Sequence, residues 1–298
     1  MSSRLKARGI VPRKSLGQNF LTDDATARRI VDAAEITAED LALEIGPGAG
    51  ALTVHLARRA GWVVAVELDH ALIPLLQREL AGSRNVAIVH GDALEVDFGS
   101  LVREAEQAFG RSFAAVRFVA NLPYYITSAA IRRILECGLP SAVIVLTVQT
   151  EVAERVVARP PDMSLLAVSV QFYGEPEFLF KISPRQFYPQ PGVESAVLRI
   201  RPHARPCEVD PCAFFRVVRA GFSQPRKQLR NTLAAGLGIT RPQAEELLLA
   251  SGIEPVRRAE TLAIAEWTRL TRFIMSSKPV GQAAFQISHE GRGASGQD

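Results

Sequence analysis

Asn121-Leu122-Pro123-Tyr124 is a run of four residues that could hold and orient a flat ring bearing an amine, such as adenine. The lone pair of such an amine is delocalised into the ring, so the amine is a poor nucleophile unless acceptors orient both of its hydrogens. The Asn121 side-chain oxygen and the Leu122 carbonyl can accept these bonds. Pro123 fixes the local backbone, and Tyr124 offers a face for stacking. The plain alternative is a strand-to-turn loop with a buried tyrosine.

A glycine-rich turn, Gly46-Pro47-Gly48-Ala49-Gly50, follows the apolar run 41–45. Glycines let the backbone turn sharply and approach a ligand closely. A helix expected from Ala51 to Arg59 would point its first amides at that ligand. The turn lacks the third glycine that the dinucleotide fingerprint requires inside the helix. It therefore favours a ligand without a pyrophosphate.

Two carboxylates follow the next two expected strands. Glu67 lies about 20 residues beyond the turn, where an acidic residue suits the hydroxyls of a ribose. Asp92, in His90-Gly91-Asp92-Ala93, can accept a hydrogen bond from an adenine amine. The carboxyl ends of parallel strands meet at one crevice, so Gly46, Glu67, Asp92 and Asn121 are expected to lie together. The set indicates methyl transfer from S-adenosylmethionine to the exocyclic amine of an adenine.

Apolar runs alternate with helical patterns through the first half of the chain. Five runs read as strands: 41–45, 62–68, 86–89, 116–120 and 142–148. This alternation predicts an α/β fold with a mostly parallel, Rossmann-like sheet. Residues 178–182 and 193–200 read as two strands without a helix between them, which makes the last strand antiparallel. Residues 164–173 fit either a helix or a strand.

The pattern is wholly helical beyond about residue 203, with four candidate helices over 214–222, 226–235, 241–251 and 262–273. We therefore expect four parts in the chain: a basic N-terminal arm (1–20), a methyltransferase domain (21–203), a small all-α domain (204–275) and a disordered tail (276–298). The tail is rich in Ser, Gly and Gln and has few large apolar residues, which is typical of disorder.

Charge is distributed unevenly. Residues 1–20 carry five basic residues and no acidic residue, and residues 201–275 carry twelve basic and seven acidic residues, whereas residues 21–200 are net acidic. The two basic segments are either solvated surface or the footprint of a polyanion. Arg226, Lys227 and Arg230 fall within one turn of an expected helix, which would place Arg226 and Arg230 on one face. They are candidate phosphate contacts.

The three cysteines, Cys137, Cys207 and Cys212, show no metal-ligand spacing, although Cys207 and Cys212 could pair. Scattered thiols favour a reducing cytoplasm. No apolar run approaches the ~20 residues of a membrane helix, and no apolar segment follows the first basic residues as in a secretory signal. We expect a cytoplasmic protein with no metal and no membrane partner.

The chain resembles the small-subunit rRNA adenine dimethyltransferases from Lys14 to about Phe273. Five segments match motifs of that family: Lys14-Ser15-Leu16-Gly17-Gln18-Asn19-Phe20-Leu21, Glu44-Ile45-Gly46-Pro47-Gly48, Val66-Glu67-Leu68-Asp69, Gly91-Asp92-Ala93 and the Asn-Leu-Pro-Tyr run. Residues 187–197 are similar to the family's proline loop. Residues 222–231 are similar to the basic helix start of its C-terminal domain, which binds RNA.

The resemblance implies that Asn19 and Leu21 join the four ligands above in an S-adenosylmethionine site. It implies that Phe187 is a second aromatic residue near the target base, and it favours a helix over 164–173. The implied substrate is a pair of adjacent adenines in the 3′-terminal hairpin of small-subunit (16S) rRNA. A monomeric enzyme would dimethylate each of them in an immature ribosomal subunit.

Three positions depart from the family pattern. Thr150 follows Gln149 where a basic residue is usual, the segment 161–165 lacks a Tyr-Gly-Arg, and Pro225 replaces an arginine. These departures bear on RNA affinity more than on methyl transfer.

Two alternatives stay open. One is a large-subunit rRNA adenine dimethyltransferase of the macrolide-resistance type, against which the helical domain argues. The other is a non-catalytic nucleic-acid-binding assembly factor, against which the intact set of Gly46, Glu67, Asp92 and Asn121 argues.

Overall fold

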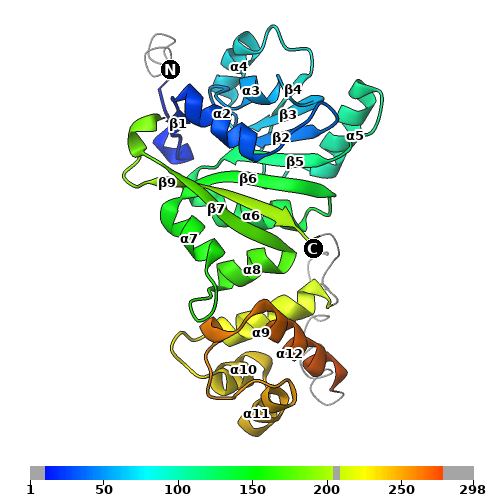
Figure 1. The fold of residues 1–298 in the computed structure, drawn as a ribbon, viewed down its shortest axis with the longest axis vertical. Coiled ribbons are helices and arrows are strands. Elements are labelled where there is room, and N and C mark those ends of the chain that lie inside the picture. The colour runs from blue at the N-terminus through cyan, green and yellow to red at the C-terminus, as the bar shows by residue number, and fades with distance from the viewer. Residues whose placement is uncertain (1–10, 204–208, 278–298) are drawn as a thin grey trace, which may run out of the picture. The chain divides into compact units, whose positions relative to one another are not determined.

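The structure is a computed structural model that describes residues 11–203 and 209–277. Within these ranges the chain divides into two compact units (Figure 1). The first unit comprises residues 11–157 and 174–203, and the second comprises residues 158–173 and 209–277. The basic residues Arg4, Lys6 and Arg8, the possible disulfide partner Cys207 and the segment 278–298 lie outside the described residues.

The first unit is built on a seven-stranded sheet in the order β4-β3-β2-β5-β6-β9-β7. Its strands are β2 (Leu41–Ile45), β3 (Trp62–Glu67), β4 (Val86–His90), β5 (Val116–Asn121), β6 (Ser141–Gln149), β7 (Gly174–Ile182) and β9 (Ser195–Pro202). Strands β2 to β6 are parallel, and β9 runs antiparallel to both β6 and β7. The predicted Rossmann-like sheet with an antiparallel last strand is confirmed.

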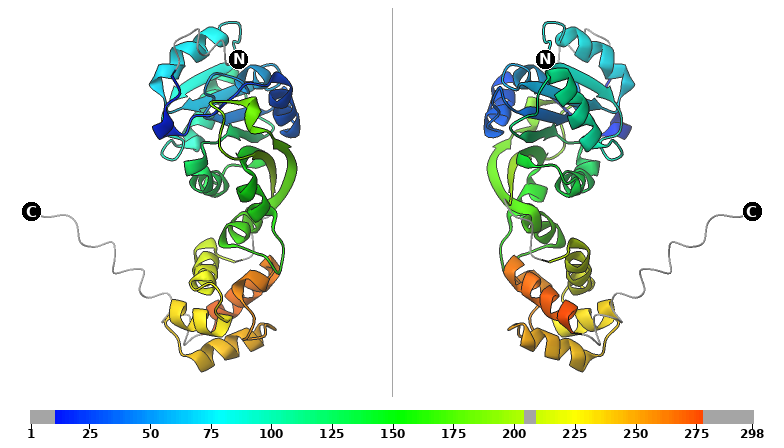
Figure 2. Two further views of the ribbon diagram at one scale, coloured as in Figure 1. Left: turned by 90° about the vertical axis from the view of Figure 1, so that its left-hand side faces the viewer. Right: turned by 90° about the vertical axis from the view of Figure 1, so that its right-hand side faces the viewer.

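The apolar runs form central strands because both faces of the sheet are covered. Every residue of β2 is buried, and five of the six residues of β3 are buried. Helices lie on both faces of this sheet (Figure 2). They are α2 (Asp24–Ala33), α3 (Thr53–Leu56), α4 (Ile73–Glu79), α5 (Phe98–Phe109), α6 (Thr127–Glu136) and α7 (Thr150–Val157).

Local signals explain where these helices begin. Asp23 and Asp97 cap α2 and α5 through side-chain bonds from the amides of Thr26 and Gly99. Pro74 lies in the first turn of α4, so the proline marks a late helix start after the short 3₁₀ helix η2 (His70–Leu72). The helix expected over 51–59 is shorter than predicted, since α3 covers only four residues.

The N-terminal segment belongs to the first unit from residue 11 onward. A 3₁₀ turn, η1 (Lys14–Leu16), ends at Gly17, and β1 (Phe20–Leu21) then pairs antiparallel with β8 (Phe187–Tyr188). A strand of two residues has no periodicity, so this small second sheet could not be predicted from the sequence. Residues 11–20, predicted as part of a basic arm, are thus fixed against the domain.

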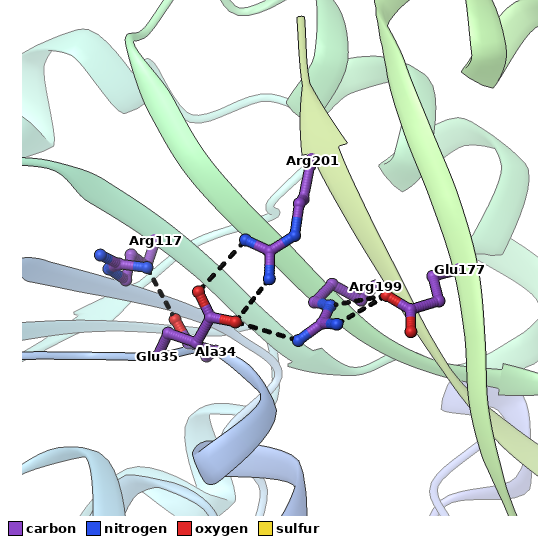
Figure 3. Close-up of polar contacts among 6 residues, drawn as sticks. All are labelled: Ala34, Glu35, Arg117, Glu177, Arg199 and Arg201. Carbon is purple, nitrogen blue, oxygen red and sulfur yellow. Dashed lines mark hydrogen bonds and ion pairs between the residues drawn. The ribbon is translucent and has the colours of Figure 1, made fainter.

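An ion-pair cluster joins the end of α2 to β9 in the first unit (Figure 3). Glu35, which has a φ of 53°, accepts bonds from Arg199 (3.1 Å to Oε1) and Arg201 (3.1 Å to Oε2). Arg117 donates to the Ala34 carbonyl at 2.9 Å. The bond from Arg201 lowers the pKa of Glu35, so the carboxylate stays charged. Arg199 also pairs with Glu177 at 2.6 Å and Arg117 with Asp40 at 2.8 Å, so these arginines are paired within the fold and do not form a free basic patch.

The second unit is helical. Its helices are α8 (Leu165–Tyr173), α9 (Pro211–Phe222), α10 (Leu229–Leu237), α11 (Arg241–Ala250) and α12 (Ile264–Ser276), with the 3₁₀ turn η5 (Ala259–Thr261). Trp267 is fully buried in its core, and Phe172 stacks on Phe214 with ring centroids 4.1 Å apart. The ambiguous segment 164–173 forms helix α8. This helix packs in the core of the second unit, although the predicted boundary at residue 203 would have assigned it to the first domain.

The predicted helix over 226–235 starts too early. Helix α10 begins at Leu229, and Arg226 lies before it with a φ of 71°. A residue before proline is biased away from the helical region, so Pro225 separates the end of α9 from the start of α10. Arg226 and Arg230 consequently do not share a helical face, and that part of the prediction is wrong.

Candidate functional site

Three neighbouring parallel strands end in register at one edge of the sheet. Ile45, the last residue of β2, pairs with Val66 of β3 and with Ala120 of β5. The residues that follow these three are the predicted ligands Gly46, Glu67 and Asn121. All three line one pocket in the first unit, together with Asp92 after β4. The structure thus brings the four predicted residues together, while their roles as ligands stay a prediction.

The glycine-rich turn forms one wall of the pocket. Gly46 and Gly48 have φ values of 67° and 58°, which favour glycine. A Cβ on Gly48 would lie 3.0 Å from the Phe20 ring, whereas a Cβ on Gly46 would meet nothing within 4 Å. The backbone at Gly46 is therefore open to close approach by a ligand, which suits the nucleoside cofactor that the turn predicts.

Glu67 joins the turn to the end of β3. The side chain is 5% exposed, Oε2 accepts a bond from the Gly48 amide at 2.9 Å, and Oε1 accepts one from the Asp69 amide at 2.8 Å. Burial raises the pKa of Glu67 above its ordinary value, and the two amide bonds oppose that rise. Each carboxylate oxygen carries two lone pairs, so both can still accept a ribose hydroxyl.

Asp92 lies at the end of β4 and is half-buried. Its Oδ1 accepts a bond from the Leu94 amide at 2.8 Å, which fixes the orientation of the carboxylate. Within the described residues Oδ2 has no hydrogen-bond partner. Oδ2 is therefore an oriented acceptor, which suits a hydrogen bond from the amine of a flat ring such as adenine.

Asp69 holds the N-terminal segment over the pocket. This buried carboxylate accepts a bond from Gln18 Nε2 at 2.8 Å and pairs with Arg13 at 3.1 Å. Residues 16–21 therefore line the pocket, including Asn19 and Leu21, which the family resemblance placed there.

The Asn-Leu-Pro-Tyr run forms the side of the pocket that follows β5. Asn121 Nδ2 donates to the Asn19 carbonyl at 3.0 Å, so the amide is held in one orientation with Oδ1 as the remaining acceptor. The Tyr124 hydroxyl lies 2.8 Å from Ser195 Oγ, which anchors its half-buried ring. Burial raises the pKa of Tyr124, so this hydroxyl is protonated at neutral pH.

Phe187 does not line this pocket. It is 5% exposed and packs in a hydrophobic cluster with Leu21, its partner in the β1–β8 pair. A base could stack on the ring only after that cluster opened. In this structure Phe187 therefore packs behind the pocket wall, and its role beside a target base stays a prediction.

Two pocket residues were missed by the sequence analysis. Glu44 is 1% exposed, its Oε2 has no hydrogen-bond partner in the described part of the chain, and burial raises its pKa to about 8. An acidic residue inside an apolar strand was the signal that could have revealed it. Tyr125 is 60% exposed and also lines the pocket; nothing in its spacing distinguished it from Tyr124.

Among the three candidate phosphate contacts, Arg230 differs from the other two. It donates to Glu245 at 2.9 Å and to Gln228, so its charge is paired within the helical unit. Arg226 and Lys227 are exposed, and neither has an ion-pair partner in the described ranges. Only these two keep an unpaired charge for a polyanion.

The sequence matches one family over nearly all of the described residues. The model for "Ribosomal RNA adenine dimethylase" matches residues 11–276. This chain belongs to the ribosomal RNA adenine dimethylase family. The predicted S-adenosylmethionine-dependent methyltransferase activity is thereby confirmed.

Individual relatives agree with this assignment. The chain is 47% identical over 272 residues to the ribosomal RNA small subunit methyltransferase A of Pelotomaculum thermopropionicum, a match that covers 89% of this chain and 92% of the relative. It is 44% identical over 277 residues to the protein of the same name in Listeria monocytogenes, with 91% and 93% covered.

Two solved structures share the fold. The crystal structure of the 23S rRNA methyltransferase ErmE is 28% identical, with a TM-score of 0.66, and the match covers 86% of this chain and 99% of that one. A dimethyladenosine transferase from Plasmodium falciparum has a TM-score of 0.74 at 22% identity, with 88% and 98% covered. Since the small-subunit relatives are much more similar in sequence than ErmE, the large-subunit alternative is not favoured. No helix among residues 11–203 and 209–277 is both long and apolar enough to cross a membrane.

Glu44 makes the stability of the enzyme depend on pH. Its folded pKa, about 8, exceeds its ordinary value of 4.5, so the folded protein keeps a proton that the unfolded chain loses in this window. The free energy of unfolding should therefore fall as the pH rises from about 5 to 8, by up to several kcal/mol. Urea titrations of Glu44→Gln should show a smaller fall. The exposed Glu154→Gln is the control, and identical pH slopes in all three proteins would contradict the buried, protonated state of Glu44.

Proposed function

We propose that this enzyme transfers methyl groups from S-adenosylmethionine to the exocyclic amines of two adjacent adenines in the 3′-terminal hairpin of small-subunit rRNA. The observation that carries the proposal is the fixed amide of Asn121. It stands at the end of β5, which β2 separates from β3 and Glu67, and its oxygen is oriented by the bond from Nδ2 to the Asn19 carbonyl.

The cofactor fits the residues on the opposite side of the pocket. Gly46 leaves its backbone open, Glu67 retains lone pairs for hydroxyl groups, and Asp92 presents an Oδ2 that has no partner among the described residues. When bound, S-adenosylmethionine supplies an electrophilic methyl group. These residues bind and orient; they do not themselves take part in the bond that forms.

The residues after β5 would prepare the nucleophile. Asn121 Oδ1 and the Leu122 carbonyl can accept the two amine hydrogens, which favours a pyramidal nitrogen with its lone pair aimed at the methyl carbon. Tyr124, anchored through its hydroxyl to Ser195, would stack on the unstacked base. No general base is required, because the product ammonium is acidic enough to lose its proton to water.

The proposal also covers the state of the substrate, the oligomeric state of the enzyme, its location and its contacts with phosphate. The substrate would be the rRNA within an immature small subunit, and the enzyme would act as a monomer. A cytoplasmic location would suit Cys137 and Cys212, neither of which forms a disulfide within the described residues. The helical unit would contact phosphates through Arg226 and Lys227, which have no ion-pair partner in the described part of the chain.

Methylation of purified immature small subunits tests the proposal directly. Wild-type enzyme with S-adenosylmethionine should place two methyl groups on each of two adjacent adenines near the 3′ end, as mapped by mass spectrometry of nuclease fragments. Asn121→Ala should lower kcat far more than it weakens rRNA binding, because its contact matters most in the transition state. Tyr124→Phe should keep most of the activity, whereas Tyr124→Ala should lose roughly 1–3 kcal/mol of stacking.

Three results would contradict the proposal. They are methylation of large-subunit rRNA instead, absence of methylation in any rRNA, and equal losses in Tyr124→Phe and Tyr124→Ala. The last would mean that the hydroxyl rather than the ring of Tyr124 is essential.

Phosphate binding by the helical unit is tested by neutralising Arg226 and Lys227 together to glutamine. The slope of log affinity against log salt should become shallower by about 0.7–0.9 for each lost phosphate contact. Arg241→Gln with Arg258→Gln is the matched control, since both side chains are exposed and ion-paired in the same unit. Arg230→Gln should leave the slope unchanged and lower stability. An unchanged slope in the first double variant would end the assignment of these two residues to RNA.

A further inference from the structure

Tyr125 is an exposed aromatic side chain at the mouth of the pocket. Of the aromatic side chains in the described residues only Tyr125 and Phe273 are exposed, at 60% and 37%. A single exposed apolar side chain is common in itself, but an exposed aromatic ring that also lines a binding pocket offers a surface on which a base can stack. Nothing in the proposed chemistry at Asn121 and Tyr124 uses it.

The ring of Tyr125 is held in place by the backbone. A Cβ built on Gly17 would lie 3.1 Å from Cδ1 and 3.4 Å from Cε1 of the ring, so this edge rests against the peptide of Gly17. Gly17 itself has a φ of 57°, which a residue with a side chain rarely adopts. One edge of the ring therefore lies against a glycine, while the residue as a whole stays 60% exposed.

Tyr124 and Tyr125 are placed to contact two different nucleotides. They are consecutive residues of the 3₁₀ turn η3 (Tyr124–Ile126), where successive side chains point about 120° apart because there are three residues per turn. Tyr124 is half-buried and bonded to Ser195, whereas Tyr125 stands at the rim. A base bound inside the pocket is covalently joined to the next nucleotide, and that nucleotide must leave across the rim.

A cation lies in the turn that ends on Gly17. Lys14 begins η1, the turn that ends on Gly17, and the side chain is exposed with no ion-pair partner within the described residues. Leu16 of the same turn lines the pocket. Proteins that bind single-stranded nucleic acid combine aromatic rings, on which bases stack, with cationic groups that attract phosphates.

We propose that Tyr125 stacks on the base adjacent to the target adenine and thereby positions the two neighbouring nucleotides together. This inference rests on the proposed function, because it takes the RNA strand as the occupant of the pocket. Tyr125 is a positioning residue: it touches the neighbour of the reacting base and not the reacting atoms. The competing possibility is that the ring serves only to hold Gly17 and the N-terminal turn in place.

A double-mutant cycle tests the proposal. Small subunits are reconstituted with rRNA in which one of the two adjacent adenosines is replaced by an abasic nucleotide, and methylation of the remaining adenine is measured. With wild-type enzyme, loss of the neighbouring base should lower kcat/KM roughly 5- to 150-fold, the range for one base–aromatic stack. Tyr125→Ala should show a loss of similar size on unmodified rRNA and little further loss on the abasic substrate. Tyr125→Phe should behave as wild type.

The controls separate stacking from support of the fold. Calorimetry should give Tyr125→Ala an unchanged affinity for S-adenosylmethionine, and Phe273→Ala should retain the full dependence on the neighbouring base. If the losses from Tyr125→Ala and from the abasic nucleotide multiply, or if Tyr125→Ala binds the cofactor more weakly in proportion to its lost activity, the stacking role is refuted. Wild-type enzyme that methylates neither adenine of unmodified subunits would instead refute the proposed function, and this inference with it.

Discussion

The buried carboxylate of Glu67 is the interaction on which the rest of the site depends. One oxygen holds the amide of Gly48 in the glycine-rich turn, and the other holds the amide of Asp69 just beyond β3. Asp69 in turn binds Gln18 and Arg13, so the N-terminal segment is fixed to the same point. A single side chain thus connects the turn, the strand end and the segment that covers the pocket.

This arrangement is unfavourable for stability. Burial raises the pKa values of Glu44 and Glu67, because removal from water disfavours their charged forms. Keeping two acidic groups in the interior therefore lowers the free energy of unfolding. The turn between them contains three glycines with positive φ. Carboxyl groups with strongly shifted pKa values are concentrated at functional sites. The position of Glu44 and Glu67 on adjacent parallel strands therefore favours this pocket, rather than the ion-pair cluster around Glu35, as the functional centre of the first unit.

Most of the first unit could be predicted because its elements carry strong local signals. Apolar runs give the buried strands, and parallel strand ends bring Gly46, Glu67, Asp92 and Asn121 to one edge. Features that depend on tertiary pairing could not be predicted. The β1–β8 pair has two residues on each side, which is too short for any periodicity, and it is this pair that buries Phe187 away from the pocket.

Two further differences have the same kind of cause. The start of α10 was misplaced because Pro225 interrupts a charge spacing that otherwise reads as helical. Tyr125 was overlooked because exposure is a property of the folded surface; only the structure reveals that its ring rests on Gly17 at the pocket mouth. The position of a motif residue at the pocket could thus be predicted, whereas the exposure of its neighbour could not.

Calorimetric titration of S-adenosylmethionine into wild-type protein and Glu67→Ala tests the central claim most directly. The account predicts that the variant loses the hydroxyl contacts, at about 1.5–3 kcal/mol for each charge-assisted bond, and that its affinity falls at least tenfold while its far-ultraviolet circular dichroism stays that of the folded protein. Asp69→Ala should weaken binding less, because it releases the N-terminal segment without removing a ligand. An unchanged affinity in folded Glu67→Ala would contradict the account.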